Sequence, residues 1–107
     1  MRHSVIAATA LAAFGACGSL DTLAQAESAA TRSLAATCAN CHGTGGVAAA
    51  GSAVPALAGQ SGDELRRKML AYKEGKLAGT IMPQLAKGYT DAQIDAIAGW
   101  FAAQKAK

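Results

Sequence analysis

Five consecutive residues constrain this chain more than any other feature: Cys38-Ala39-Asn40-Cys41-His42. Two cysteines three positions apart, followed at once by a histidine, form the C-x-x-C-H pattern that attaches a c-type haem. At the end of a helix, two thiols with this spacing can reach the two vinyl groups of one porphyrin and form thioethers. His42 would then lie under the iron as its proximal ligand. The sequence therefore predicts one haem c, bound covalently through Cys38 and Cys41.

Other roles of a cysteine pair fit this sequence less well. A structural zinc site takes four ligands, commonly from a second cysteine pair or a pair of histidines. Beyond residue 26 the chain has no other cysteine and no other histidine. A thioredoxin-like redox pair needs a βαβ setting, and no segment shows the sustained alternation of apolar and polar residues that indicates a strand. A plain disulfide would leave His42 without a role.

Residues 1–26 are typical of a bacterial export signal. They contain a basic start, an apolar run over residues 5–16 and an Ala-Gln-Ala cleavage site that ends at Ala26. We expect cleavage there and a single mature domain, residues 27–107, in the periplasm. The alternative is lipidation at Cys17, whose surroundings loosely resemble a lipoprotein cleavage box. In that case the protein would be anchored to the membrane.

The predicted mature domain is small and contains few large apolar side chains. It has 81 residues, much of its apolar content is alanine, and its aromatic residues are Tyr72, Tyr89, Trp100 and Phe101. A chain of this size rarely folds stably without a metal, a disulfide or a cofactor. The formal net charge of +3 is low for a nucleic-acid-binding protein, which normally concentrates more positive charge on one face. We therefore expect a cofactor in the core and no nucleic acid as a partner.

The sequence predicts an all-α domain with three main helices. Residues 28–38 are alanine-rich and favour a short helix. A second helix begins at the S-x-x-E capping box of residues 61–64 and ends near Glu74, before Gly75. A third begins at the T-x-x-Q capping box of residues 90–93. Its apolar face has the spacing i, i+3, i+4, i+7 and consists of Ile94, Ile97, Ala98 and Phe101.

Two glycine-rich segments, residues 43–60 and 75–89, separate the predicted helices and favour irregular loops. The second segment contains Met82, which lies 40 residues after His42 and directly before Pro83. Such a loop can bring a thioether to the far face of a haem. The other methionine of the mature chain, Met69, lies at helical spacing within the second helix, which suits packing better. We therefore expect Met82 to be the second axial ligand.

Ligation by His42 and Met82 would occupy both faces of the iron. A soft thioether favours Fe(II) and raises the reduction potential, and oxygen or peroxide would have no free coordination position. This favours electron transfer without substrate chemistry. A haem gas sensor or a small peroxidase is a less favoured alternative because it needs an open distal site.

The order of these features resembles the class I cytochromes c over essentially all of residues 28–104. The resemblance implies a fold of three main helices around one haem. It also implies that the carbonyl of Pro55 accepts a hydrogen bond from the proximal histidine, and that Leu57 packs on the haem. The aromatic of the terminal helix, Trp100, would cross the first helix at the small residues of 29–36.

Residues 54–60 and 80–90 look like the cytochrome subunit of flavocytochrome c sulfide dehydrogenases. This resemblance implies a partner subunit that contains FAD, oxidises sulfide in the periplasm and passes electrons to the cytochrome. Some such subunits carry two haems, whereas this chain has one C-x-x-C-H motif. A free small periplasmic electron shuttle, working with another redox protein, is the alternative.

Five basic residues lie on and just after the second predicted helix: Arg66, Arg67, Lys68, Lys73 and Lys76. The simplest interpretation is a solvated helix face. The alternatives are a docking patch, whose charges would mainly affect the rate of encounter with a partner, or salt bridges to haem propionates.

Overall fold

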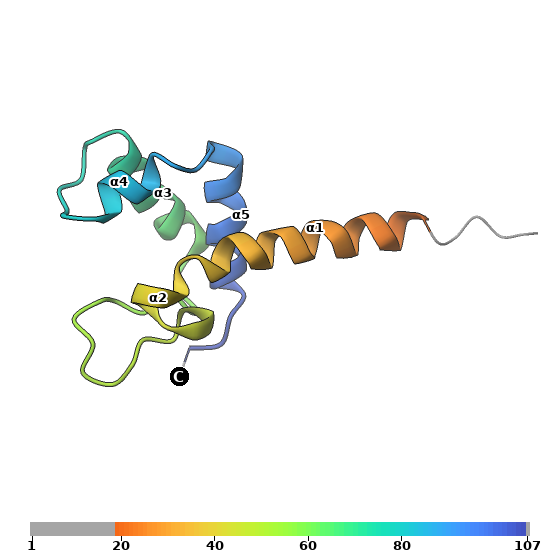
Figure 1. Ribbon diagram of the computed structural model, residues 1–107, viewed down its shortest axis with the longest axis horizontal. Coiled ribbons are helices and arrows are strands. Elements are labelled where there is room, and N and C mark those ends of the chain that lie inside the picture. The colour runs from red at the N-terminus through yellow and green to blue at the C-terminus, as the bar shows by residue number, and fades with distance from the viewer. Residues whose placement is uncertain (1–18, 107) are drawn as a thin grey trace, which may run out of the picture.

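The computed structural model describes the backbone of residues 19–106 and the side chains of residues 28–106. Within residues 19–106 it contains helices and no strand, so the predicted all-α class is confirmed (Figure 1). Residues 1–18, which include most of the predicted export signal and Cys17, lie outside the described part. The elements in chain order are α1 (Ser19–Ala36), α2 (Ala39–His42), the 3-10 helix η1 (Thr44–Gly46), α3 (Gly62–Lys73), α4 (Met82–Ala86) and α5 (Asp91–Ala102).

Helix α1 is longer than the sequence predicts. It begins at Ser19 rather than near residue 28, and it continues across the predicted cleavage position after Ala26. The cleavage itself stays a prediction. At its other end, the amide of Thr37 donates to the carbonyl of Leu34 (3.2 Å) and the amide of Cys38 to that of Ala35 (3.1 Å). This tight turn ends α1 and starts α2 at the motif.

Helix α3 begins and ends close to its predicted limits. The Ser61 hydroxyl accepts a hydrogen bond from the amide of Glu64 (3.4 Å), so one half of the predicted capping box forms. The Glu64 carboxylate instead binds the Arg67 guanidinium (2.6 Å). Gly75, with φ +73°, ends the helix as predicted. The amide of Lys76 donates to the carbonyl of Ala71 (2.8 Å), which is the long hydrogen bond of a Schellman motif.

Helix α5 has the complete capping box that the sequence predicts. The Thr90 hydroxyl accepts from the amide of Gln93 (3.1 Å), and the Gln93 side chain accepts from the amide of Thr90 (2.9 Å). The predicted apolar face is buried, as expected, and consists of Ile94, Ile97, Ala98 and Phe101.

The sequence predicts an irregular loop over residues 75–89, and this prediction is wrong in part, because the segment contains α4. Met82 and Pro83 form the first turn of this five-residue helix. Proline suits that position because its fixed φ is already helical and its missing N–H has no partner to lose there. Met82 therefore lies at the start of a helix rather than within a loop.

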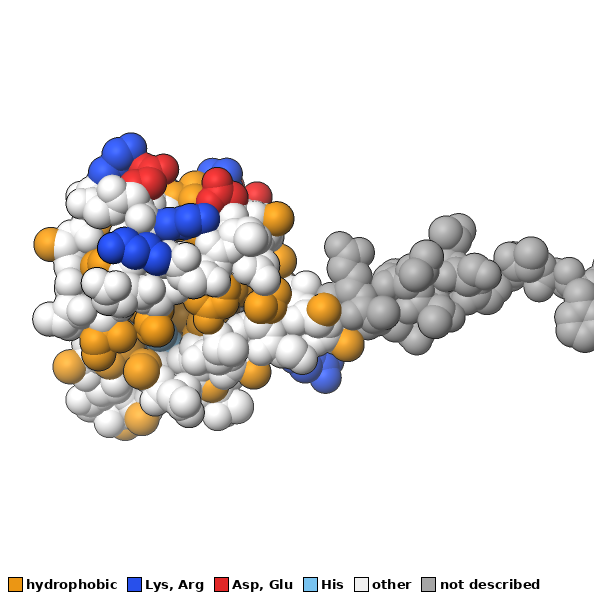
Figure 2. Space-filling model, turned by 45° about the horizontal axis from the view of Figure 1, so that its top comes forward, with side chains coloured by type: hydrophobic (Ala, Val, Ile, Leu, Met, Phe, Trp, Pro, Cys, Tyr) orange, Lys and Arg blue, Asp and Glu red, His pale blue; other side chains and the backbone are white. Residues whose placement is uncertain are grey.

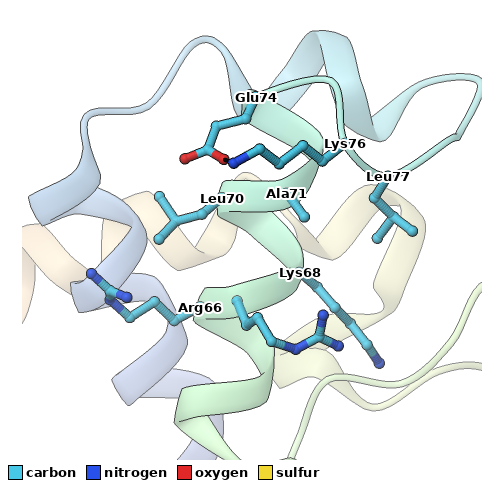
Figure 3. Close-up of a pocket in the computed structure, with 8 residues that line it drawn as sticks. Arg66, Lys68, Leu70, Ala71, Glu74, Lys76 and Leu77 are labelled. Carbon is cyan, nitrogen blue, oxygen red and sulfur yellow. Dashed lines mark ion pairs between the residues drawn. The ribbon is translucent and has the colours of Figure 1, made fainter.

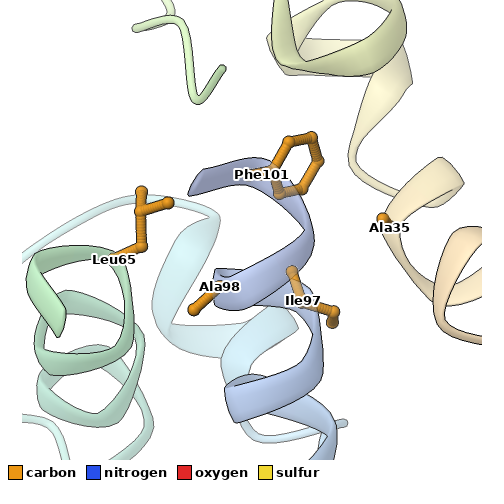
Figure 4. Close-up of a cluster of buried hydrophobic side chains, with 5 residues drawn as sticks. All are labelled: Ala35, Leu65, Ile97, Ala98 and Phe101. Carbon is orange, nitrogen blue, oxygen red and sulfur yellow. The ribbon is translucent and has the colours of Figure 1, made fainter. Parts of the chain in front are cut away.

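The core lies where α5 packs against α1 and α3, while α4 packs on α3 and α2 packs on η1. Its central cluster is drawn in Figure 4 and consists of Ala35, Leu65, Ile97, Ala98 and Phe101. Trp100, the residue expected to cross the first helix, is only partly buried at the edge of this cluster. Its ring meets that of Phe101 edge to face at 4.9 Å, and Phe101 is the more deeply buried aromatic.

Candidate functional site

The C-x-x-C-H motif occupies a single helical turn. The carbonyl of Cys38 accepts hydrogen bonds from the amides of Cys41 (3.3 Å) and His42 (3.0 Å), so all three residues lie on α2 or at its N-terminal cap. Both thiols are free; Cys38 is partly buried and Cys41 is exposed. The arrangement presents two unpaired thiols one turn apart beside an imidazole.

His42 is buried, with 8% of its surface exposed. Its Nδ1 lies 2.7 Å from the carbonyl oxygen of Pro55. A carbonyl can only accept, so Nδ1 carries the proton and Nε2 is the nitrogen with a free lone pair. Fixing the tautomer in this way is how a second contact orients a histidine for a metal. This is the contact that the resemblance to class I cytochromes c implies for Pro55.

The path of the 47–56 loop explains how Pro55 reaches His42. The carbonyl of Gly46 accepts hydrogen bonds from the amides of Leu57 (2.8 Å) and Ala58 (3.1 Å), and these bonds close the loop at its base. Leu57 is partly buried and packs against the core cluster. The loop therefore starts and ends beside the core, and Pro55 lies near its returning end.

Burial raises the pKa of the Cys38 thiol above its usual value. Loss of hydration is the largest cause, and a weak contact with the Thr37 hydroxyl at 4.0 Å opposes it. The Cys38 thiol therefore ionises less readily than an exposed thiol.

Met82 lies at the start of α4 and is partly buried. Two large apolar residues flank it and remain accessible: Ile81 is 59% exposed and Leu85 is 49% exposed. Helices α2 and α4 lie at the same end of the molecule, on the left in Figure 1, and α1 extends in the opposite direction. The segment with Met82 thus lies at the same end as the segment with the two thiols.

These residues fit a covalently attached haem c. The donor set is two free thiols at the attachment spacing, an imidazole with a free Nε2 and a partly buried thioether, and apolar surface lies beside it. Within residues 28–106, no group of three or more His, Cys, Asp or Glu side chains could hold a metal ion directly.

The five basic residues of the predicted cluster are all paired with carboxylates in the structure. Lys73 binds Asp91 (2.7 Å) and Lys76 binds Glu74 (2.5 Å). Arg66 binds Asp95, and both Arg67 and Lys68 bind Glu64. This pairing agrees with the solvated helix face and gives no support to an open basic docking patch.

An open hollow of about 580 Å³ lies over the outer face of α3, among these charged side chains (Figure 3). The apolar residues that line it are Leu70, Ala71 and Leu77. Its lining includes neither the C-x-x-C-H motif nor Met82. Leu65, the buried residue of α3, does not line it either. We therefore do not assign the haem site to this hollow.

Charge is distributed unevenly along the chain. No Lys, Arg, Asp or Glu occurs between Arg32 and Asp63 or between Lys76 and Lys87. These two stretches include both cysteines of the C-x-x-C-H motif, His42, Pro55 and Met82. In Figure 2, acidic and basic side chains gather on one part of the surface, and hydrophobic side chains form a band beside them. The two stretches that carry the candidate site residues therefore contribute no charged side chain to the surface.

Two functional candidates were not apparent from the sequence. The Tyr89 hydroxyl lies 2.6 Å from the Thr37 hydroxyl, although 52 positions separate the two residues. No periodicity or motif signals such a contact, because hydroxyl pairs form wherever the fold brings two chain segments together.

Residues 25–101 match the family model described as cytochrome c oxidase, cbb3-type, subunit III. No curated protein matches the chain. Among the helices of the described part, none is both long and apolar enough to cross a membrane. The matched residues include the C-x-x-C-H motif, Pro55 and Met82 and cover most of the chain. The chain therefore belongs to this family of c-type cytochrome domains, and its fold is that of an electron carrier rather than of a catalytic enzyme.

Proposed function

We propose that the protein transfers single electrons in the periplasm through one haem, attached to Cys38 and Cys41 and ligated by His42 and Met82. The observation that best supports this proposal is the 2.7 Å contact between His42 Nδ1 and the carbonyl of Pro55. A histidine with that tautomer, next to two free thiols, is prepared to bind iron through Nε2. The bound haem would supply a reversible one-electron change at iron.

Each residue has a separate task in this proposal. Cys38 and Cys41 retain the cofactor after export. Pro55 orients the imidazole, and Leu57 adds apolar packing that excludes water. Met82 would fill the second axial position, raise the potential and exclude oxygen. Together these residues favour electron exchange over chemistry at the iron.

We further propose that the electrons come from a flavoprotein with an FAD-bearing subunit that oxidises sulfide. The support is the resemblance of residues 54–60 and 80–90 to cytochrome subunits of flavocytochrome c sulfide dehydrogenases. Sulfide oxidation releases electrons in pairs, and a flavin can accept a pair and pass the electrons on singly. The exposed side chains of Ile81 and Leu85, in a stretch without charged residues, suit a stable docked subunit, because the buried centre of an interface is poor in charge.

The first experiment tests attachment. The chain is expressed with haem-attachment machinery and run on a denaturing gel that is stained for haem. The wild type should stain, and the Cys38→Ala, Cys41→Ala double variant should not. A colourless wild-type band would overturn covalent haem.

The second experiment tests the axial ligand. Met82→Ala should abolish the far-red sulfur-to-iron absorption band of the oxidised protein, lower the potential and allow carbon monoxide to bind the reduced form. Met69→Ala is the matched control, because it removes the same side chain from α3, and it should retain the band. Loss of the band in the Met69 variant alone would contradict the assignment.

The third experiment tests the partner. Size-exclusion chromatography of the protein from native periplasm should give a complex with a flavin spectrum. Elution as a lone monomer would favour the free electron shuttle. Co-elution with other subunits of a cytochrome c oxidase would instead favour the assembly that the family description names.

A further inference from the structure

The hydroxyls of Thr37 and Tyr89 form a directed pair. Thr37 Oγ1 donates to the carbonyl of Leu34 at 2.7 Å, and a hydroxyl has one proton to give. Tyr89 Oη, 2.6 Å from Thr37 Oγ1, must therefore be the donor in the second hydrogen bond. The Thr37 side chain is consequently held by the carbonyl of Leu34 at the end of α1, and the Tyr89 hydroxyl is held by Thr37.

This pair joins the two chain segments that supply the candidate ligands. Thr37 directly precedes Cys38, whose Sγ lies 4.0 Å from the same hydroxyl. Tyr89 follows α4, and its amide donates to the carbonyl of Ala86 (3.3 Å), the fully buried last residue of the helix that begins with Met82. We call residues 37–42 the Cys38 side and residues 82–89 the Met82 side.

We infer that Tyr89 is a positioning residue, which holds the Met82 side against the Cys38 side and so favours Met82 over external ligands at the haem iron. The inference rests on the proposed function, because it assumes ligation by Met82. Tyr89 does not touch the ligand atoms in this account. It acts through the short helix α4, which is anchored at its far end by Ala86.

The effect follows from the populations of two states. An external ligand can bind only when the Met82 side moves away, and that movement breaks the Thr37–Tyr89 hydrogen bond. The Tyr89 ring packs against the core cluster, whereas its hydrogen bond with Thr37 is exposed. Removing one such bond should increase the open population, and the apparent affinity for an external ligand, about fivefold.

The test uses imidazole as the probe and the oxidised holoprotein of the full chain. Loss of the sulfur-to-iron band during titration reports displacement of Met82. We expect Tyr89→Phe, which removes only the hydroxyl, to bind imidazole about fivefold more tightly than the wild type. Thr37→Val removes the same bond together with the Thr37–Leu34 hydrogen bond, so its imidazole affinity should rise at least as much. The double variant should bind imidazole no more tightly than Thr37→Val, because Tyr89→Phe then has no further bond to remove.

A second variant separates positioning from general destabilisation. Thr90→Ala removes the N-cap of α5 next to Tyr89 and should lower stability to urea by a similar amount. It leaves the Thr37–Tyr89 bond intact and should leave the imidazole affinity unchanged. Equal imidazole affinity in Tyr89→Phe and wild type, or an equal increase in Thr90→Ala, would overturn the inference.

The outcomes also separate this inference from the proposed function. If the wild type has no sulfur-to-iron band, ligation by Met82 fails and the inference fails with it. If the band is present in the wild type and lost in Met82→Ala, but Tyr89→Phe titrates like the wild type, only the positioning role is wrong.

Discussion

At Gly46 the backbone passes closer to its neighbours than a side chain would allow. The residue has φ +77°, and a Cβ built there would lie 2.7 Å from Phe101 Cδ1 and 2.8 Å from the amide of Ala58. Its carbonyl also closes the loop that holds Pro55. One residue thus connects the core aromatic to the contact that orients His42.

We expect Gly46→Ala to destabilise the protein by about 3 kcal/mol, from the left-handed backbone and the collision with Phe101. The matched control is Gly51→Ala. Gly51 has φ +76° but nothing within 4 Å of the added Cβ, so only the backbone cost of about 1 kcal/mol should appear. Urea unfolding of the holoprotein measures both changes. Equal losses in the two variants would show that the close approach to Phe101 is unimportant.

Single residues differ in how well the sequence predicts them. Cys38, Cys41 and His42 are identified by a contiguous pattern whose chemistry requires no tertiary information. The contact between Pro55 and His42 spans 13 positions and depends on the loop path, so it was expected only from the resemblance to a family. The Thr37–Tyr89 pair has neither source and was found only in the structure.

Among the helices, capping explains which boundaries were predictable. The Thr90 and Gln93 side chains have no competing ion pair, and the capping box of α5 forms completely. In α3 the Glu64 carboxylate binds Arg67 and Lys68, so only the Ser61 half forms. Helix α4 was missed because it has five residues, no side-chain N-cap and glycine-rich flanks, which favour a loop.

The same difference predicts unequal effects of removing each cap. Thr90→Ala should lower the free energy of unfolding by about 1 kcal/mol, and Ser61→Ala by about 0.5 kcal/mol, because the Ser61 bond is long at 3.4 Å and has no reciprocal partner. Urea denaturation followed by circular dichroism would compare them. A larger loss for Ser61→Ala would contradict this account of the two helices.

For the whole molecule, surface ion pairs predict how stability depends on pH. Hydrogen bonding to Arg67 lowers the pKa of Glu64 to about 2 from its usual 4.5, and Lys73 lowers the pKa of Asp91. Both carboxylates bind protons more readily in the unfolded chain. Their contribution to stability is therefore complete above pH 4.5 and is lost as the pH falls toward about 2.

In Glu64→Gln, the free energy of unfolding should therefore fall less steeply as the pH drops through that acidic range. Near neutral pH, its dependence on pH should change little. Urea unfolding at a series of pH values measures this. High salt should reduce the difference between variant and wild type, because both partners are exposed and screened. An unchanged acid dependence in Glu64→Gln would show that the pair is already broken in solution.

The C-x-x-C-H turn has a consequence for the order of events during maturation. The proposed attachment needs only residues 38–42, whereas Met82 comes 40 residues later, on α4, which packs on α3. Contacts between distant residues form late, because closing a long loop costs entropy before the contact gains energy. If the chain is exported and carries the haem as proposed, attachment would therefore precede folding, and the later helices would assemble on the attached porphyrin. A fragment that ends at residue 60 should accordingly stain for covalent haem while failing to show the sulfur-to-iron band.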